Sequence, residues 1–244
     1  MSDRLRQRVY RHYVTAWDQA AAPATLEHLA PRAPYLREVV SRYFPANKSA
    51  EILDLGCGHG ALLHFAHEAG YLAASGVDVS VEQVETAARL GIPGVEQGDL
   101  MATLGGLAGE SVDLVVAFDV IEHFTKDELV DFIDAVYRVL KPGGAWLIHT
   151  PNAGSPFVGA VRYGDITHEQ AFTRTSIEQV LRASGFRAVA SYECAPVVHG
   201  VASRLRGWLW RGVRFALRAI DAIVTGDTGR AAIYTRNFLA LARK

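Results

Sequence analysis

Acidic and imidazole side chains gather in two segments of the 244-residue sequence. The first reads Asp119-Val-Ile-Glu122-His123, and the second contains Asp165 and His168. If the first segment is helical, the i, i+3, i+4 spacing places its three polar side chains on one face. We therefore expect one of two kinds of site. Asp119, Glu122, His123 and His168 could bind Mg²⁺ or Mn²⁺, or His168, His123 and Asp165 could transfer protons without a metal. A third alternative is that Glu122 and His123 only shape a pocket.

A glycine-rich turn lies upstream, in Glu51-Ile-Leu-Asp-Leu-Gly-Cys-Gly-His-Gly60. The apolar residues predict a short strand, and Gly56, Gly58 and Gly60 would let the backbone approach a ligand closely. Asp54 at the strand end could accept a hydrogen bond from an amino group of that ligand. A tight strand-to-helix turn without a ligand is the alternative. Cys57 suits the turn by its small size, since a nucleophilic thiol would need a basic partner nearby.

Apolar runs alternate with segments of helical periodicity, which predicts a parallel sheet with right-handed crossovers. The carboxyl ends of such strands meet at one crevice, where Asp54, Asp78, Asp99 and Asp119 would gather. We expect strands at 52–55, 73–79, 95–97, 112–118, 145–150, 186–193 and 233–242, and helices at 33–44, 60–70, 80–90, 126–140 and 173–184. The helix after residue 80 should begin with a capping box of Ser80 and Gln83.

Five motifs in this order resemble the class I S-adenosylmethionine-dependent methyltransferases: Leu53-Asp-Leu-Gly-Cys-Gly, Gly76-Val-Asp-Val-Ser80, Gly98-Asp-Leu, Phe118-Asp-Val-Ile-Glu-His123 and Leu140-Lys-Pro-Gly-Gly144. The resemblance covers about residues 50–193 and the final strand. It implies an α/β, Rossmann-like fold whose seven-stranded, mostly parallel sheet has helices on both faces and an antiparallel last strand.

The resemblance also implies S-adenosylmethionine as cofactor, with Asp78 at the ribose and Asp99 near the adenine. The expected contacts are Asp54, Gly56, Cys57, Gly58, Asp78, Val79, Asp99, Leu100, Phe118 and Asp119. A dinucleotide-dependent oxidoreductase is the alternative for the glycine turn. It would need a second region for a hydride acceptor, and the Lys-Pro-Gly-Gly turn argues against it.

The acid-x-x-Glu-His block is similar to the metal-binding block of ubiquinone-pathway O-methyltransferases and of small-RNA 2′-O-methyltransferases. Here position 119 is Asp rather than Glu, and Thr150-Pro-Asn152 precedes His168 as a comparable segment precedes the later histidine of the RNA enzymes. We expect O-methylation of a small-molecule or lipid-linked acceptor, with a saccharide favoured and His168 as base. The alternatives are RNA 2′-O-methylation, disfavoured because Arg162 is the one fixed cation of the acceptor loop 151–172, and an inactive cofactor-binding partner subunit.

Composition and charge limit the classes of binding partner and the cellular compartment that we expect. The net charge is −1 and the pI is near 6.8, so no DNA binding is expected. Two cysteines and the absence of a secretory signal fit a cytoplasmic protein. We divide the chain into an N-terminal helical cap, 1–50, and a methyltransferase domain, 51–244, with a helical insertion at 196–230.

Residues 201–224 of this insertion form a basic amphipathic segment with two tryptophans. Such a helix is typical of peripheral membrane contact, and arginines 4, 6, 8 and 11 could join the same surface. The alternatives are packing on the domain or in a homodimer, with the arginines in water. The segment from Gly226 to Gly229, with Ile233–Leu239 after it, resembles the tails of bacterial methyltransferases of surface-polysaccharide and glycolipid pathways.

Overall fold

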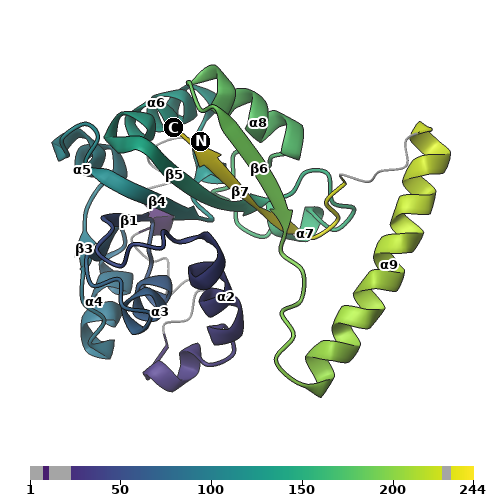
Figure 1. Ribbon diagram of the computed structural model, residues 1–244, viewed down its shortest axis with the longest axis horizontal. Coiled ribbons are helices and arrows are strands. Elements are labelled where there is room, and N and C mark those ends of the chain that lie inside the picture. The colour runs from purple at the N-terminus through teal and green to yellow at the C-terminus, as the bar shows by residue number, and fades with distance from the viewer. Residues whose placement is uncertain (1–7, 11–22, 227–231) are drawn as a thin grey trace.

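The computed structural model describes residues 8–10, 23–226 and 232–244, and it contains one seven-stranded sheet (Figure 1). The strands are β1 (Ile52–Leu55), β2 (Ala74–Asp78), β3 (Val95–Gln97), β4 (Val112–Phe118), β5 (Leu140–Pro151), β6 (Ala188–Glu193) and β7 (Asn237–Arg243). Their order is β3-β2-β1-β4-β5-β7-β6. The first five pair in parallel, and β7 runs antiparallel to both β5 and β6. The predicted fold class is confirmed.

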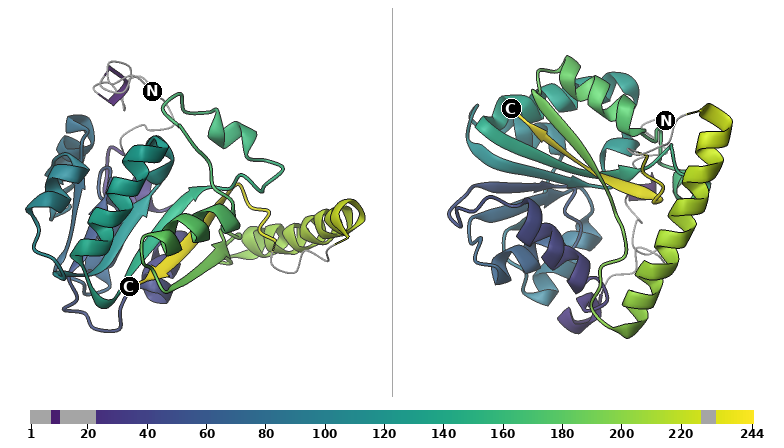
Figure 2. Two further views of the ribbon diagram at one scale, coloured as in Figure 1. Left: turned by 90° about the horizontal axis from the view of Figure 1, so that it is seen from above. Right: turned by 45° about the vertical axis from the view of Figure 1, so that its right-hand side comes forward.

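Helices cover both faces of the sheet (Figures 1 and 2). One face carries η2 (Leu26–Leu29), α2 (Ala33–Tyr43), α3 (Ala61–Glu68) and α4 (Val81–Leu90), and the other carries α5 (Leu100–Gly106), α6 (Lys126–Val139) and α8 (Arg174–Ala183). Each set packs its apolar side into its own buried cluster against the sheet. The burial of these apolar side chains supplies most of the stability that holds the strand ends in place.

Three further elements lie outside these two sets of helices. The 3₁₀ turn η3 (Ile121–His123) follows β4, and α7 (Gly159–Arg162) lies within the acceptor loop. Long helix α9 (Val201–Thr225) stands beside the domain rather than over the sheet (Figures 1 and 2). None of the described helices combines the length and the apolar character needed to cross a membrane.

Several local expectations needed correction. The Ser80–Gln83 capping box is wrong, because the Ser80 side chain makes no cap bond and its backbone N–H donates instead to Asp78 Oδ1 at 2.8 Å. Helix α5 was not anticipated, and Asp99 caps it by accepting from Ala102 N at 2.9 Å. The last strand begins at Asn237 rather than at residue 233.

The division into a cap and a domain stays a prediction. Within the described part of 1–50, α2 packs in the same cluster as α3, through Leu36, Val39 and Val40. Arginines 4, 6 and 11 lie outside the described residues.

Candidate active site

The glycine turn after β1 has the backbone that the sequence predicted. Gly56, Gly58 and Gly60 have φ values of 72°, 56° and 76°, in the left-handed region that favours glycine. A Cβ at Gly56 would lie 2.5 Å from Val120 Cγ2, so the turn also packs tightly against the segment that follows β4. The turn therefore brings backbone N–H groups and the ends of β1 and β4 to one place.

Asp54 is 3% exposed at the end of β1. No hydrogen bond to its carboxylate is found among the described residues. Burial, together with the charge of Asp78, raises the pKa of Asp54 to about 8. A buried acid of this kind is stabilised in its charged form by a cation, so its position fits the positively charged amino group of a bound amino-acid moiety.

The carboxylates at the ends of β2 and β3 are oriented differently from each other. Asp78 Oδ2 accepts from Gly58 N at 2.8 Å and Oδ1 accepts from Ser80 N, which fixes its orientation beside the glycine turn. Each oxygen keeps a further lone pair for a hydroxyl group. Asp99 is exposed, and its Oδ1 caps α5.

The other predicted contacts lie along the same strand ends. Val79 is 46% exposed, Leu100 packs partly into the core, and Phe118 contacts the His149 ring at a centroid distance of 5.2 Å. Burial raises the pKa of the Cys57 thiol, and the nearby carboxylates of Asp54 and Asp78 raise it further. A thiol in this state is a poor nucleophile.

Asp119 at the end of β4 pairs with β5 rather than with η3. Its φ of 56° is unusual for a residue other than glycine, and its Oδ1 lies 2.8 Å from His149 Nδ1 and 3.4 Å from Asn237 Nδ2. Burial would raise the pKa of Asp119 and lower that of His149, but each partner's charge reverses the effect. The two form an ion pair, with the side chains 49% and 11% exposed.

Glu122, His123 and His168 form the predicted cluster without Asp119. One ligand atom from each lies within 4.8 Å of the others. The prediction that Asp119 shares their face is wrong, because its left-handed backbone turns it toward His149.

Glu122 is the fully buried member of this cluster, and its Oε2 accepts from Thr150 Oγ1 at 3.1 Å. Its Oε1 has no hydrogen-bond partner in the described structure. Burial and the charge of Asp119 raise the pKa of Glu122 well above its usual value. Such a buried, half-satisfied carboxyl requires a reason to be retained, and a bound ion or substrate hydroxyl would supply the missing partner.

Hydrogen bonds fix the tautomers of both imidazoles. His168 Nδ1 lies 3.0 Å from the carbonyl oxygen of Val161, so that nitrogen carries the proton. Thr167 Oγ1 donates to Asp165 Oδ1 at 2.6 Å and therefore accepts from His123 Nδ1 at 2.9 Å. The His168 ring consequently presents its Nε2 lone pair as the remaining acceptor. Burial and the neighbouring His168 lower the pKa of His123 to about 4, so the ring is neutral at pH 7.

Asp165 thus acts through Thr167 and not directly. It is 7% exposed, and it also accepts from the Thr167 backbone N–H at 2.8 Å. The sequence grouped Asp165 with His123 and His168 as residues that could transfer protons, and the structure connects Asp165 with His123 through the Thr167 hydroxyl.

The acceptor loop is fastened over the cluster by backbone contacts. The N–H groups of Glu169 and Gln170 both donate to the Glu122 carbonyl, at 2.8 and 3.0 Å. Arg162 donates to the carbonyls of His168 and Glu169, at 2.6 and 2.7 Å. These bonds hold His168 at a fixed place opposite η3.

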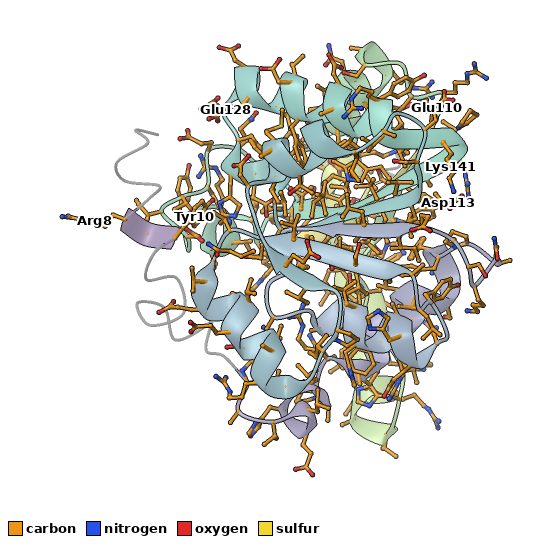
Figure 3. All side chains as sticks on the ribbon, turned by 90° about the vertical axis from the view of Figure 1, so that its left-hand side faces the viewer. Arg8, Tyr10, Glu110, Asp113, Glu128 and Lys141 are labelled. Atoms are coloured by element: carbon orange, nitrogen blue, oxygen red, sulfur yellow. The ribbon has the colours of Figure 1, made fainter. Side chains whose placement is uncertain are left out.

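Tyr10 lies beside the cluster, with its ring centroid 6.1 Å from that of His123. Figure 3 shows Tyr10 at one end of the molecule and the ion pair of Lys141 and Asp113, which spans 2.6 Å, at the other. The Lys-Pro-Gly-Gly motif therefore lies far from the cluster of Glu122, His123 and His168. Tyr10, Thr167 and the pairing of His149 were not anticipated from the sequence; only the tyrosine-rich N-terminal segment offered a signal.

A model of the methyltransferase domain family matches residues 27–191, more than half of the chain. The chain belongs to the class I S-adenosylmethionine-dependent methyltransferases. This methyltransferase is 29% identical over 197 residues to the mitochondrial ubiquinone biosynthesis O-methyltransferase of Rattus norvegicus, covering 69% of this chain and 55% of that protein. It is 28% identical over 159 residues to the small RNA 2′-O-methyltransferase of Mus musculus, covering 59% and 39%. The chain thus spans about half or less of these curated relatives.

Solved structures share the fold of this methyltransferase. One is a SAM-dependent methyltransferase from Archaeoglobus fulgidus, with a TM-score of 0.64 and 20% identity over 90% of this chain and all of that one. Another is Haemonchus contortus phosphoethanolamine N-methyltransferase 2 in complex with S-adenosyl-L-methionine, with a TM-score of 0.59 and 21% identity over 86% of this chain and 52% of that one. At these identities the likeness concerns the fold alone.

Proposed function

We propose that this methyltransferase transfers the methyl group of S-adenosylmethionine to a hydroxyl group of a small or lipid-linked acceptor, with a saccharide favoured. The observation that carries the proposal is the cluster of Glu122, His123 and His168 under the acceptor loop. Bound S-adenosylmethionine supplies a methyl group already activated by a positive sulfur. The protein must then align an acceptor and remove its proton.

The cofactor site fits this role. Gly58 has no side chain that would block a ligand from the glycine turn. Its backbone N–H holds the Asp78 carboxylate beside the turn, and each carboxylate oxygen keeps a lone pair for a ribose hydroxyl. Asp54 is a buried acid that lacks a hydrogen-bond partner among the described residues, as an ammonium group would require.

His168 is our proposed base. Its Nδ1–H is bonded to the Val161 carbonyl, so Nε2 is available to accept the proton of an acceptor hydroxyl. His123 and Glu122 lie within reach of the same point and would orient that hydroxyl. Asp165 holds His123 in place through Thr167.

A metal ion is the alternative to a free base. Glu122, His123 and His168 would hold it, and it would polarise the acceptor oxygen and lower the pKa of its hydroxyl. Of the two ions expected, two imidazoles fit Mn²⁺ better than Mg²⁺, which takes mainly oxygen ligands. The hydrogen bonds on both Nδ1 atoms are of the kind that orient metal-bound histidines.

One experiment separates these roles. Labelled S-adenosylmethionine and a cell extract identify the acceptor. The activities of His168→Ala and of the wild type with and without a chelator are then measured. We expect His168→Ala to lose about 100-fold or more in kcat/KM, with His199→Ala, an exposed histidine, as control. Loss with chelator, restored by Mn²⁺, indicates the metal. Activity that survives both changes would exclude both roles.

RNA is the second acceptor considered, because one curated relative is a small RNA 2′-O-methyltransferase. The structure weakens this alternative. Arg162 donates to two carbonyls of its own loop, so it is already engaged within the protein. Methylation of a labelled oligoribonucleotide at physiological salt would reverse this preference.

A further inference from the structure

Helix α9 presents its apolar side to solvent and its polar side to the domain. Its exposed apolar side chains include Val201, Leu205, Trp208, Leu209, Phe215 and Ile223, which are 61–84% exposed. At about 100° per residue these six lie on one face. A helix that stabilised the domain by packing would turn this face inward.

Polar contacts on the opposite side fix this orientation. Arg214 Nη1 lies 3.2 Å from Glu193 Oε2 at the end of β6, and Asp221 accepts from the Tyr234 hydroxyl at 3.3 Å. Trp210 Nε1 and Arg214 Nε are shielded from solvent on that side. Helix α9 thus contacts its own domain through Arg214 and Asp221, while Arg204, Arg206 and Arg211 are exposed.

The positive charge of α9 favours one kind of partner for its exposed apolar face. Helix α9 contains five arginines and a single acid, Asp221. Of the arginines, Arg204 and Arg211 are exposed at one edge of the apolar face, and Arg206 is exposed at the other. Because Asp221 is bonded to Tyr234, a second α9 packed on this face would bring arginines together without acids to neutralise them. Anionic lipid headgroups would neutralise these arginines, and Trp208 has the amphipathic ring that favours a membrane interface.

We infer that α9 lies flat in the surface of an anionic lipid bilayer, with its apolar face among the acyl chains near the headgroups and its flanking arginines at the phosphates. The inward contacts to Glu193 and Tyr234 keep the domain on the water side. This inference does not depend on the acceptor, since it rests on α9 alone.

Flotation of the whole protein with vesicles tests the inference. We expect binding to vesicles of equal parts phosphatidylcholine and phosphatidylglycerol, and little binding to phosphatidylcholine alone. Leu205→Gln/Leu209→Gln should weaken binding at least about tenfold, because two exposed leucines leave the membrane. The matched control Leu26→Gln/Leu72→Gln changes two exposed leucines outside α9 and should bind normally.

The arginines are tested in the same assay. Arg204→Gln/Arg211→Gln should lose about fivefold for each charge removed, whereas Arg37→Gln/Arg182→Gln removes two charges elsewhere and should have little effect. Unchanged S-adenosylhomocysteine affinity and thermal unfolding would show that each variant is folded. Absence of vesicle binding overturns the inference, and a dimer dissolved by Leu205→Gln/Leu209→Gln would assign the face to a second copy instead.

Discussion

Asp54 is buried at the point where the cofactor's amino group is expected, and its pKa is raised from the usual 3.8 to about 8 by burial and by Asp78. The folded protein therefore holds a proton here that the unfolded chain releases near pH 4. Stability from this proton is fully present below pH 4, and it is lost as the pH rises to about 8. Within this window the loss is about 1.4 kcal/mol for each pH unit.

Asp54→Asn should remove this pH dependence. We expect the variant to match the wild type near pH 4 and to be more stable by a few kcal/mol at pH 9, because a neutral amide replaces a buried charge. Urea unfolding at both pH values measures the difference. The same variant should bind S-adenosylhomocysteine more weakly at pH 8 by calorimetry, since it cannot balance the ammonium charge. An equal stability difference at both pH values would contradict the assignment.

Thr167 connects His123 to Asp165, and its side chain is fully buried. Thr167→Val keeps the shape but removes the hydroxyl, leaving Asp165 and His123 Nδ1 each without this partner. We expect a loss of about 1–3 kcal/mol in the free energy of unfolding and a lower kcat with an altered pH profile. Thr167→Ser restores the hydroxyl and should recover both. If Thr167→Val lowers stability alone, Thr167 serves only the fold.

At the scale of elements, the glycine turn and the segment after β4 are packed against each other. Gly56→Ala combines a left-handed φ of 72° with a Cβ placed 2.5 Å from Val120 Cγ2. We expect a loss of stability of about 1–2 kcal/mol from the backbone and about 1–3 kcal/mol more from overpacking. Thermal unfolding and cofactor affinity should fall together.

Two further variants separate the backbone strain of Gly56→Ala from its clash with Val120. The cost of Gly56→Ala should shrink in a Val120→Ala background, because the clash is removed while the backbone strain stays. Gly105→Ala in α5 has no neighbour within 4 Å of the added Cβ, so it should leave stability unchanged or raise it slightly. Equal costs in both backgrounds would show that Val120 is not the obstacle.

The sequence predicted the seven strands and the glycine turn, because apolar runs and glycines report directly on buried strands and tight turns. The antiparallel last strand was implied by the resemblance to the class I methyltransferases. It missed α5, whose Leu100–Gly106 segment ends in two glycines and shows weak periodicity. It also started the last strand at 233, although residues before Asn237 bond instead to the acceptor loop: Asn152 Nδ2 donates to the Ile233 and Thr235 carbonyls.

The site was harder to predict than the fold. Spacing placed Asp119 with Glu122 and His123, but one left-handed residue redirects a side chain, and no periodicity reports that. The pairing of Asp119 with His149 joins neighbouring strands 30 residues apart in sequence, and the bond from His123 to Thr167 spans 44. Such contacts depend on register and loop path, which only the packed structure decides.

At the scale of the whole molecule, hydrogen bonds connect α9 to the acceptor loop. Asp221 of α9 accepts from the Tyr234 hydroxyl, and the Tyr234 carbonyl accepts from Ser155 Oγ at 2.8 Å within the loop. The segment around Tyr234 therefore contacts both the helix and the loop that holds His168. A lipid surface that fixes α9 would also fix the position from which an acceptor reaches this loop.

Hydrogen exchange measures how firmly α9 is held. Its inward side contacts the domain through a few polar pairs, whereas β4 and β5 are buried in the sheet, so α9 amides should exchange much faster than theirs. Tyr234→Phe removes the bond to Asp221, and Glu193→Gln removes the charge opposite Arg214. Each exposed or half-buried pair contributes at most about 1 kcal/mol, so the double variant should speed exchange in α9 severalfold.

Exchange in β4 and β5 should stay unchanged, because none of these groups packs on the sheet core. Equal acceleration throughout the protein would mean that α9 stabilises the whole fold, and no acceleration in α9 would mean that other contacts set its orientation.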